Sequence, residues 1–81
     1  MDMTIFTTHN IVESNAVIVK VFCNDDGYFE FLDANSASSN KMLTTLGQIA
    51  QMDNSVLKAM DLKPGSYAER DSVNSPWIVK G

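Results

Sequence analysis

Two runs of strand-forming residues on either side of an Asp-Gly turn constrain the fold of this chain more than any other feature. The first run, Ala-Val-Ile-Val-Lys-Val-Phe-Cys, spans residues 16–23, and the second, Tyr-Phe-Glu-Phe-Leu, spans residues 28–32. Residues 24–27 between them read Asn-Asp-Asp-Gly. Such runs around Asp-Gly are typical of a β-hairpin, because the turn requires positive φ angles that these residues adopt readily. We therefore predict an antiparallel hairpin at this place.

The turn also predicts which side chains face each other across the hairpin. With a two-residue turn at Asp-Gly, Phe22 lies opposite Phe31 and Val21 lies opposite Leu32. An aromatic pair of this kind contributes about 0.5 to 1.5 kcal/mol beyond the burial of its area. The first run is apolar on both faces, which predicts a strand in the middle of a sheet, because edge strands usually carry more charge.

The middle of the chain is typical of a loop followed by two short helices. Residues 33–40 are small and polar, which indicates a loop. Thr45 and Gln48 have the spacing of a capping box and predict a helix over about residues 45–52. Asp53 can cap a second short helix that ends before the Pro-Gly turn. The expected apolar faces are Leu46, Ile49 and Ala50 in the first helix and Val56, Leu57 and Met60 in the second.

The two ends of the chain contribute further strands. Residues 67–70 and 77–79 flank a turn rich in Asp, Ser, Asn and Pro, and they predict a C-terminal hairpin. Residues 4–8 fit an edge strand, whereas residues 11–14 fit either the end of a strand or a turn of helix. The expected fold is therefore α+β, a small antiparallel β-sheet of an N-terminal hairpin plus a C-terminal hairpin, with two short helices inserted between them. A chain of 81 residues has room for a single domain, residues 1–81.

Composition and charge disfavour several classes of partner. With 44% hydrophobic and 20% charged residues, the chain has the composition of a globular domain. Its net charge of −4 disfavours nucleic acid and anionic membrane surfaces, which are themselves negative. Cys23 has no second cysteine to pair with, and its place at the end of an apolar run indicates a buried thiol. We expect neither a signal peptide nor a membrane span, and hence a cytoplasmic location.

The inventory of reactive side chains does not favour catalysis. His9 is the only histidine, and its weakly structured surroundings make it a poor general base for a serine or cysteine nucleophile. One histidine and one cysteine are too few for a typical zinc site, and the Asp-Asp-Gly turn lacks the alternating ligands of a calcium loop. None of the four glycines forms a phosphate-binding loop. We therefore expect no enzymatic activity, no metal and no cofactor.

The best candidates for a binding site are polar side chains near the turns. Carboxylates at neighbouring strand ends form an acidic patch if the turns converge. Tyrosine and tryptophan tend to anchor protein interfaces, but in so small a chain we favour the interpretation that Trp77 closes the core. The predicted binding residues are Asp25, Asp26, Tyr28, Glu69 and Asp71.

Several fragments occur in an order that resembles a family of small bacterial domains. They are Asp-Gly-Tyr-Phe-Glu-Phe-Leu from residue 26, Thr-Leu-Gly-Gln-Ile-Ala from residue 45, Met-Asp-Asn-Ser-Val from residue 52, Leu-Lys-Pro-Gly-Ser-Tyr-Ala-Glu-Arg from residue 62, and Pro-Trp from residue 76. The family is one of unknown function that is grouped with the immunity proteins of polymorphic toxin systems. The resemblance covers about residues 15–80. It implies a compact α+β domain that neutralises a toxin by binding it, without a cofactor.

Two functional hypotheses follow. The first is a cytoplasmic protein-binding domain of the immunity type, which blocks a basic toxin domain by direct contact through an acidic face. The second is a structural domain without catalytic activity that homo-oligomerises through a sheet edge or around Trp77.

Overall fold

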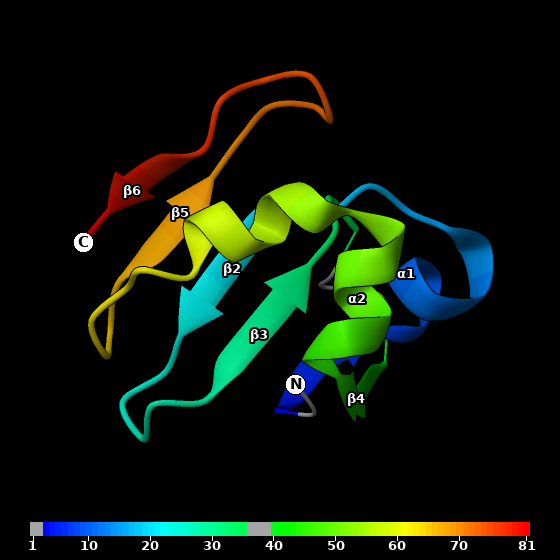
Figure 1. Cartoon of the computed structure of the whole chain (residues 1–81), viewed down its shortest axis with the longest axis horizontal. Coiled ribbons are helices and arrows are strands. Elements are labelled where there is room, and N and C mark those ends of the chain that lie inside the picture. Colours follow the sequence, from blue (N-terminus) through cyan, green and yellow to red (C-terminus); the bar gives the residue numbers. More distant parts are fainter. Residues whose placement is uncertain (1–2, 36–39) are drawn as a thin grey trace.

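A mostly antiparallel β-sheet organises the chain (Figure 1). The computed structural model describes residues 3–35 and 40–81, and within them six strands are arranged in the order β4-β1-β3-β2-β5-β6. All neighbouring strands are antiparallel except β1 and β3, which are parallel. The strands are β1 (Thr4–Thr8), β2 (Lys20–Cys23), β3 (Phe29–Leu32), β4 (Lys41–Thr45), β5 (Tyr67–Glu69) and β6 (Ile78–Lys80).

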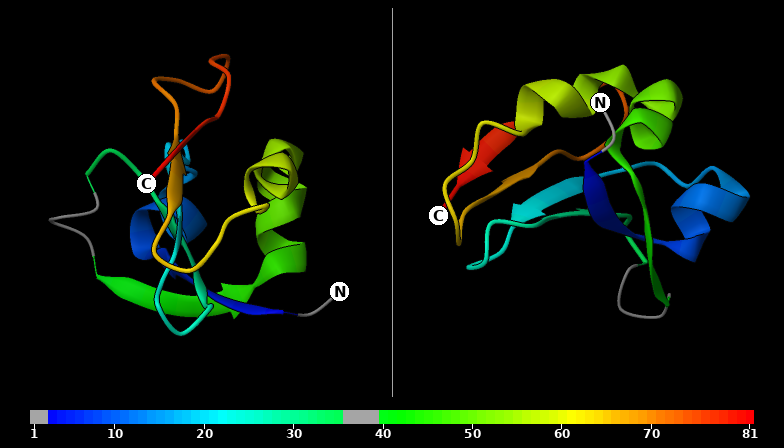
Figure 2. Two further views of the ribbon diagram at one scale, coloured as in Figure 1. Left: turned by 90° about the vertical axis from the view of Figure 1, so that its left-hand side faces the viewer. Right: turned by 60° about the horizontal axis from the view of Figure 1, so that its bottom comes forward.

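Three short helices accompany the sheet within the described residues. They are α1 (His9–Ser14), α2 (Leu46–Met52) and the 3₁₀ helix η2 (Asn54–Ala59). Figure 2 shows α2 and η2 together on one side of the sheet, whereas α1 lies at the end of β1 from which it continues. The predicted α+β class is therefore confirmed. None of the described helices has the length and apolar character needed to cross a bilayer.

Side chains that the sequence marks as caps begin two of the three helices. The Thr45 hydroxyl accepts a hydrogen bond from the Gln48 backbone N–H at 3.3 Å, as the capping box predicts. The Gln48 side chain does not reach back to Thr45; its Oε1 accepts from the Thr44 hydroxyl at 2.8 Å. Asp53 caps η2 by accepting from the Ser55 N–H at 3.0 Å. This second helix is a 3₁₀ helix in which Leu57, expected to be buried, is 38% exposed.

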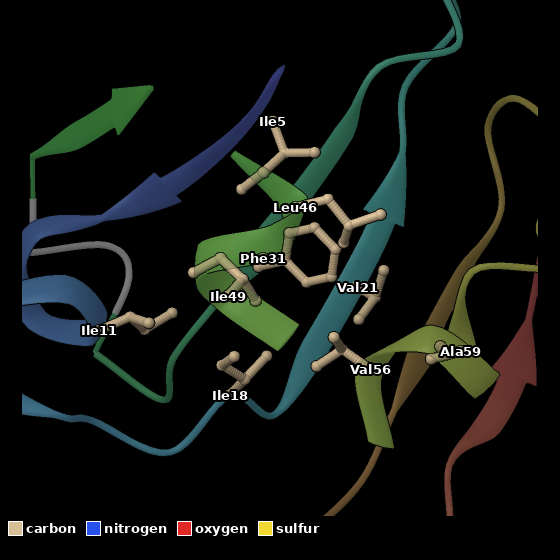
Figure 3. Close-up of a cluster of buried hydrophobic side chains, with 10 residues drawn as sticks. Ile5, Ile11, Ile18, Val21, Phe31, Leu46, Ile49, Val56 and Ala59 are labelled. Atoms are coloured by element: carbon tan, nitrogen blue, oxygen red, sulfur yellow. The ribbon is translucent and has the colours of Figure 1, made fainter. Parts of the chain in front are cut away.

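The hydrophobic core fills the space between the sheet and these helices (Figure 3). Val21 of β2 and Phe31 of β3 form its floor, and both are fully buried. Trp77 is half-buried and packs against the core, which supports the interpretation of this residue as a core element. The buried members are Ile5, Ile11, Ile18, Val21, Phe31, Leu46, Ile49, Val56, Ala59 and Ala68.

The pairing of β2 with β3 differs by one residue from the register that we predicted. Val21 pairs with Phe31 and Phe22 pairs with Glu30, so the predicted pair of Phe22 with Phe31 is wrong. The reason is a three-residue turn in which Gly27 has a φ of 86°. The Asn24 side chain stabilises this longer turn, because its Oδ1 accepts from the backbone N–H groups of residues 26 and 28, both at 3.0 Å. The shift buries Val21 and Phe31 on the same face.

The first strand, β1, is not the edge strand that we predicted for residues 4–8. β1 lies between β4 and β3, and each of its five residues pairs with one residue of β4. β4 itself was not predicted; it forms one edge of the sheet, and β6 forms the other. β2 lies between β3 and β5, which confirms the predicted central strand. Of the loop predicted over residues 33–40, residues 36–39 lie outside the described part of the chain.

Substitutions at Gly27 test whether the three-residue turn sets the register. Gly27→Val should lower the free energy of unfolding by about 1 to 2 kcal/mol, because a β-branched residue resists positive φ. Gly27→Asn should cost less, since asparagine tolerates this conformation. A Cβ atom added at Gly27 would have no other atom within 4 Å, so the substitutions test only the cost of the positive φ angle. Urea denaturation followed by circular dichroism measures the difference, and equal losses for the two variants would contradict this account of the turn.

Candidate protein-binding surface

One face of the sheet is packed against α2 and η2, and the opposite face carries a second set of apolar side chains. Along β1, Ile5 and Thr7 are fully buried on the helix side. Phe6 lies between them and is only half-buried, because successive side chains of a strand point to opposite faces. The same alternation in β2 separates the buried Val21 from the half-buried Phe22. The sheet therefore has a second, incompletely covered apolar surface.

The register of the strands places these side chains in one row across the sheet. Phe6 pairs with Leu43 of β4 and with Glu30 of β3. Glu30 pairs with Phe22, and Phe22 pairs with Tyr67 of β5. Paired residues of neighbouring strands point to the same face. The row thus reads Leu43, Phe6, Glu30, Phe22, Tyr67 and finally Lys80 of β6.

Further apolar side chains extend this row along the strands. Tyr28 precedes β3, and its ring meets that of Phe6 edge to face, with centroids 6.3 Å apart and an interplanar angle of 87°. This is a favourable aromatic geometry. Tyr28 is 56% exposed, Leu43 is 58% exposed and Ile78 of β6 is 56% exposed. We call the surface formed by Phe6, Phe22, Tyr28, Leu43, Tyr67 and Ile78, together with Lys20, Glu30, Lys41, Glu69 and Lys80, the open face.

Every charged side chain of the open face interacts with another residue of the same face. Lys41 Nζ lies 2.8 Å from Glu30 Oε1, and Lys80 Nζ lies 3.2 Å from Glu69 Oε1. Lys20 Nζ stands 4.5 Å from the centre of the Tyr67 ring, within the range of a cation–π contact. With three lysines and two glutamates, the open face carries a net charge of +1, although the whole chain carries −4. The acidic excess lies elsewhere on the molecule.

The predicted acidic patch does not form, because its carboxylates lie at opposite ends of β2. Asp25 and Asp26 are in the turn that follows Cys23. Glu69 pairs with Lys20 at the beginning of β2. Lys20, which lies beside Glu69, is five residues before Asp25. In extended chain this spacing separates Glu69 from Asp25 by roughly 16 Å. Antiparallel pairing of β5 with β2 carries the two acidic groups apart.

Each predicted binding residue nonetheless has a definite place. Asp25 lies beside the following turn, since a Cβ atom added at Gly65 would be 3.3 Å from its Oδ1. Tyr28 and Glu69 both belong to the open face, at its two ends. Glu69 and Asp71 are the two predicted residues that the structure brings together, and they line a hollow of about 420 Å³ between β5, β6 and the loop joining them. The other lining residues are Val19, Arg70, Ser75, Pro76, Ile78 and Lys80.

A buried arginine holds the loop beside this hollow. The side chain of Arg70 is only 1% exposed and forms an ion pair with Asp53. Its Nε donates to the Ile18 carbonyl oxygen at 2.9 Å, and its Nη1 donates to the Ser55 hydroxyl at 2.9 Å. A buried guanidinium is tolerated only when such partners replace water. Arg70 therefore joins the end of β5 to the segment before β2 and to the start of η2.

Trp77 completes this arrangement from the other side of the loop. Its ring lies against the Arg70 guanidinium, with Cζ 4.2 Å from the ring centre, and its Nε1 donates to the Ser55 hydroxyl at 3.2 Å. These contacts occupy both the face of the indole and its polar atom. The sequence analysis identified the cap at Asp53 and the core position of Trp77, but it missed their connection through Arg70. No local pattern reveals it, because Ser55 and Ile18 are 15 and 52 residues from Arg70 in the chain.

The environment of Asp53 changes its proton affinity. Burial raises the pKa of its carboxyl group, but hydrogen bonds from the Ser55 hydroxyl, from Arg70 and from the Ser55 backbone, together with the Arg70 charge, outweigh burial. The pKa of Asp53 is therefore held below its ordinary value of 3.8. A carboxyl group whose pKa is lowered by folding stabilises the folded state when it is ionised. The stabilisation by ionised Asp53 is complete at pH values above its ordinary pKa. It disappears as the pH falls through the lowered pKa of the folded state.

Reactive side chains do not gather elsewhere in the described residues. His9 Nδ1 lies 3.0 Å from Glu13 Oε2 on the exposed side of α1, and the Cys23 thiol is buried. Within residues 3–35 and 40–81, no three histidine, cysteine or carboxylate side chains form a group suited to a metal ion. The open face is thus the candidate functional surface, and its aromatic and aliphatic side chains are suited to contact with another protein.

Comparison with known proteins adds no relative. No family model matches the chain, and no curated protein and no solved structure is significantly similar to it. The resemblance to immunity-type domains therefore stays a prediction.

Substitutions of Arg70 test whether its buried contacts hold the fold together. Arg70→Ala should lower the free energy of unfolding by about 3 to 5 kcal/mol, because it leaves Asp53 partly buried and unpaired. Arg70→Lys should recover only part of this loss, since an ammonium group cannot donate to all the same partners. Lys58→Ala, a change at an exposed cation on η2, is the control and should shift stability by less than about 0.5 kcal/mol. Similar losses for Arg70→Ala and Lys58→Ala would contradict the assigned role.

The lowered pKa of Asp53 predicts a specific dependence of stability on pH. The free energy of unfolding should fall as the pH drops below the ordinary value of 3.8, because the unfolded chain takes up a proton there more readily than the folded one. Asp53→Asn should be less stable at neutral pH and should lose less stability on acidification. Asp61→Asn, at an exposed carboxyl beyond η2, should follow the wild type. Urea titrations at a series of pH values measure the slopes, and identical slopes for Asp53→Asn and the wild type would refute the prediction.

Proposed function

We propose that this protein is a binding domain that acts by contact with another protein chain through the open face. The observation that carries this proposal is that Leu43, Phe6, Phe22 and Tyr67, with Glu30 among them, lie on a face that neither α2 nor η2 covers. Folded monomers rarely leave a contiguous apolar surface without a role. Aromatic residues are also enriched at the centres of protein interfaces, and the open face contains Phe6, Phe22, Tyr28 and Tyr67.

The rigidity of the sheet supports this proposal. Phe6 and Phe22 are half-buried and belong to β1 and β2, so a partner gains contact area without first ordering a loop. The ion pair of Lys80 with Glu69 lies at one end of the row, whereas Glu30, which is paired with Lys41, lies inside the row between Phe6 and Phe22.

The finer form of the proposal is an immunity protein of bacterial origin that acts in the cytoplasm and neutralises a toxin without catalysis. Its support is the family resemblance of residues 15–80 and the net charge of −4. In this form, a basic toxin domain contacts the exposed carboxylates beside the open face. Asp25 and Asp26 lie beyond one end of β2, and Asp71 lies beyond the other, all three exposed.

Partner capture with matched variants tests the proposed binding domain. The full chain and two leucine-to-lysine variants serve as baits in lysate of the native host. Leu43→Lys places a charge on the open face, whereas Leu57→Lys places the same charge on η2. A specific partner, identified by mass spectrometry, should bind the wild type and Leu57→Lys. Its affinity for Leu43→Lys should be lower by about tenfold or more.

Two outcomes would contradict the proposal. One is a partner that binds Leu43→Lys as tightly as the wild type, and the other is the absence of any partner, including a second copy of the chain. The immunity form has a separate test, in which the identified partner arrests growth when expressed alone and co-expression of this chain restores growth. A partner that does not arrest growth would contradict the immunity role but would still be consistent with a binding domain.

A structural, self-associating domain is the alternative, and one observation favours it. The open face has its charges balanced internally, so two copies can approach without strong repulsion. Association around Trp77 is less well supported, because contacts with Arg70 and Ser55 occupy that side chain. Association through a sheet edge has a candidate in β6, where Ile78 and Val79 are 56% and 62% exposed.

A further inference from the structure

We infer that the partner of this protein adds an extended segment to the free edge of β4, so that the backbone of the segment continues the sheet. This inference rests on the proposed function, since it names the part of the partner that lies beside Leu43 of the open face. The segment that this edge selects has an apolar residue followed two positions later by an acidic residue.

Hydrogen bonds between β1 and β4 fix which backbone groups of β4 point away from the sheet. The Leu46 N–H donates to the Met3 carbonyl oxygen at 2.8 Å, and the His9 N–H donates to the Asn40 carbonyl oxygen at 3.1 Å. In an antiparallel pair, directly opposite residues alternate between hydrogen-bonded and non-hydrogen-bonded pairs. With the observed register, the even-numbered residues of β4 direct their backbone groups toward β1, and the odd-numbered residues direct theirs outward.

The outward backbone groups of β4 form a row that another strand can pair with. Lys41 and Leu43 each offer an N–H and a C=O group. Thr45 offers its N–H, because the carbonyl oxygen of an N-cap residue accepts the first bond of its helix. Among the described residues, no further strand lies on this side of β4. Such an edge is a template for another extended chain.

The opposite edge of the sheet, at β6, is a poorer template. The Arg70 N–H donates to the Val19 carbonyl oxygen at 3.0 Å. The same alternation therefore directs the backbone groups of Ala68 toward β2 and those of the other two residues of β5 toward β6. Of the three residues of β6, only Val79 then directs its backbone groups outward. β4 offers the longer row, and the added segment belongs there.

Leu43 selects an apolar residue in the added segment. Its side chain is 58% exposed and lies on the open face beside Phe6, with which it pairs. A residue that pairs with Leu43 across the new edge points to the same face. An apolar side chain at this position covers the exposed part of Leu43 and extends the row of the open face by one residue.

Lys41 selects an acidic residue two positions further along the segment. It is the only charged residue in β1, β4 and α2, and its side chain is 55% exposed. Its ammonium group contacts Glu30, and with three N–H groups it can donate to a second carboxylate as well. Antiparallel pairing is the more stable kind, and in that direction the residue opposite Lys41 follows the residue opposite Leu43 by two positions. Opposite charges on paired strands attract each other.

A second copy of the chain does not supply this pattern. The strands with a free edge are β4 and β6, whose residues are Lys-Met-Leu-Thr-Thr and Ile-Val-Lys. Neither strand contains an acidic side chain, so pairing of either one with β4 places no carboxylate beside Lys41. The pattern therefore favours a segment of a different protein.

Selection of peptides from a phage-displayed random library against the full chain tests this inference. The selected peptides should share the spacing apolar, any residue, acidic. Labelled synthetic copies are then titrated by fluorescence anisotropy. Lys41→Glu should weaken their binding about tenfold or more, and exchange of the acidic peptide residue for lysine should restore it. Lys58→Glu, the same change at an exposed lysine of η2, should leave the affinity within about twofold of the wild type.

Amide hydrogen exchange measured by NMR reports on the backbone pairing itself. In the free chain, the Met42 and Thr44 amides should exchange slowly, because they face β1, and the Lys41 and Leu43 amides should exchange fast. A saturating selected peptide should slow the Lys41 and Leu43 amides by about tenfold or more. Circular dichroism verifies that each variant is folded.

Several outcomes would overturn the added strand. They are the selection of no peptide, equal weakening by Lys41→Glu and Lys58→Glu, and binding that leaves the Lys41 and Leu43 amides unprotected. Protection of these amides that rises with protein concentration in the absence of peptide would show a second copy on the edge, and it would overturn the inference too.

The proposed binding function is judged separately. Peptides that Ile78→Lys weakens and Lys41→Glu does not would place the contact on the open face away from β4. That result would overturn the added strand and leave the binding domain standing. Failure of the binding domain itself is decided by the partner capture with Leu43→Lys and Leu57→Lys.

Discussion

The buried guanidinium of Arg70 is the interaction on which the arrangement of this protein depends. It contacts Ile18 before β2, Asp53 and Ser55 at the start of η2, and the Trp77 ring before β6. A charged group that is almost fully buried is stable only if these partners are all in place. The last third of the chain, the central strand and the helix pair are therefore ordered together, and the loop between β5 and β6 takes its position from the same contacts.

The fixed position of the helices determines which surface is left for function. α2 and η2 cover one face of the sheet with Leu46, Ile49 and Val56, and they do not cover the other. That face must then carry its own apolar residues into contact with solvent or with another chain. Phe22 on β2 pairs directly with Tyr67 on β5, and Phe6 on β1 lies on the other side of Glu30 of β3. The proposed contact function thus follows from how a small chain divides its apolar residues between two faces.

Local chemistry explains which predictions are confirmed. The cap at Thr45, the cap at Asp53 and the central position of β2 follow from side chains that act within a few residues or from a run of apolar residues. The hairpin register failed because Asn24, outside the Asp-Gly pair, binds two backbone N–H groups and lengthens the turn by one residue. The acidic patch failed because the convergence of two turns depends on strand order, which no single turn specifies.

The sequence by itself determined the local elements of this protein: a turn at Gly27, helix starts at Thr45 and Asp53, and the α+β class. Hydrogen bonding and backbone preference over short distances suffice for these features. Only the tertiary structure decided that Phe6, Phe22 and Tyr67 lie in one row, and that Arg70 meets Asp53. Both outcomes require contacts between residues far apart in the chain, whose free energy depends on the packing of the whole sheet and not on any local pattern.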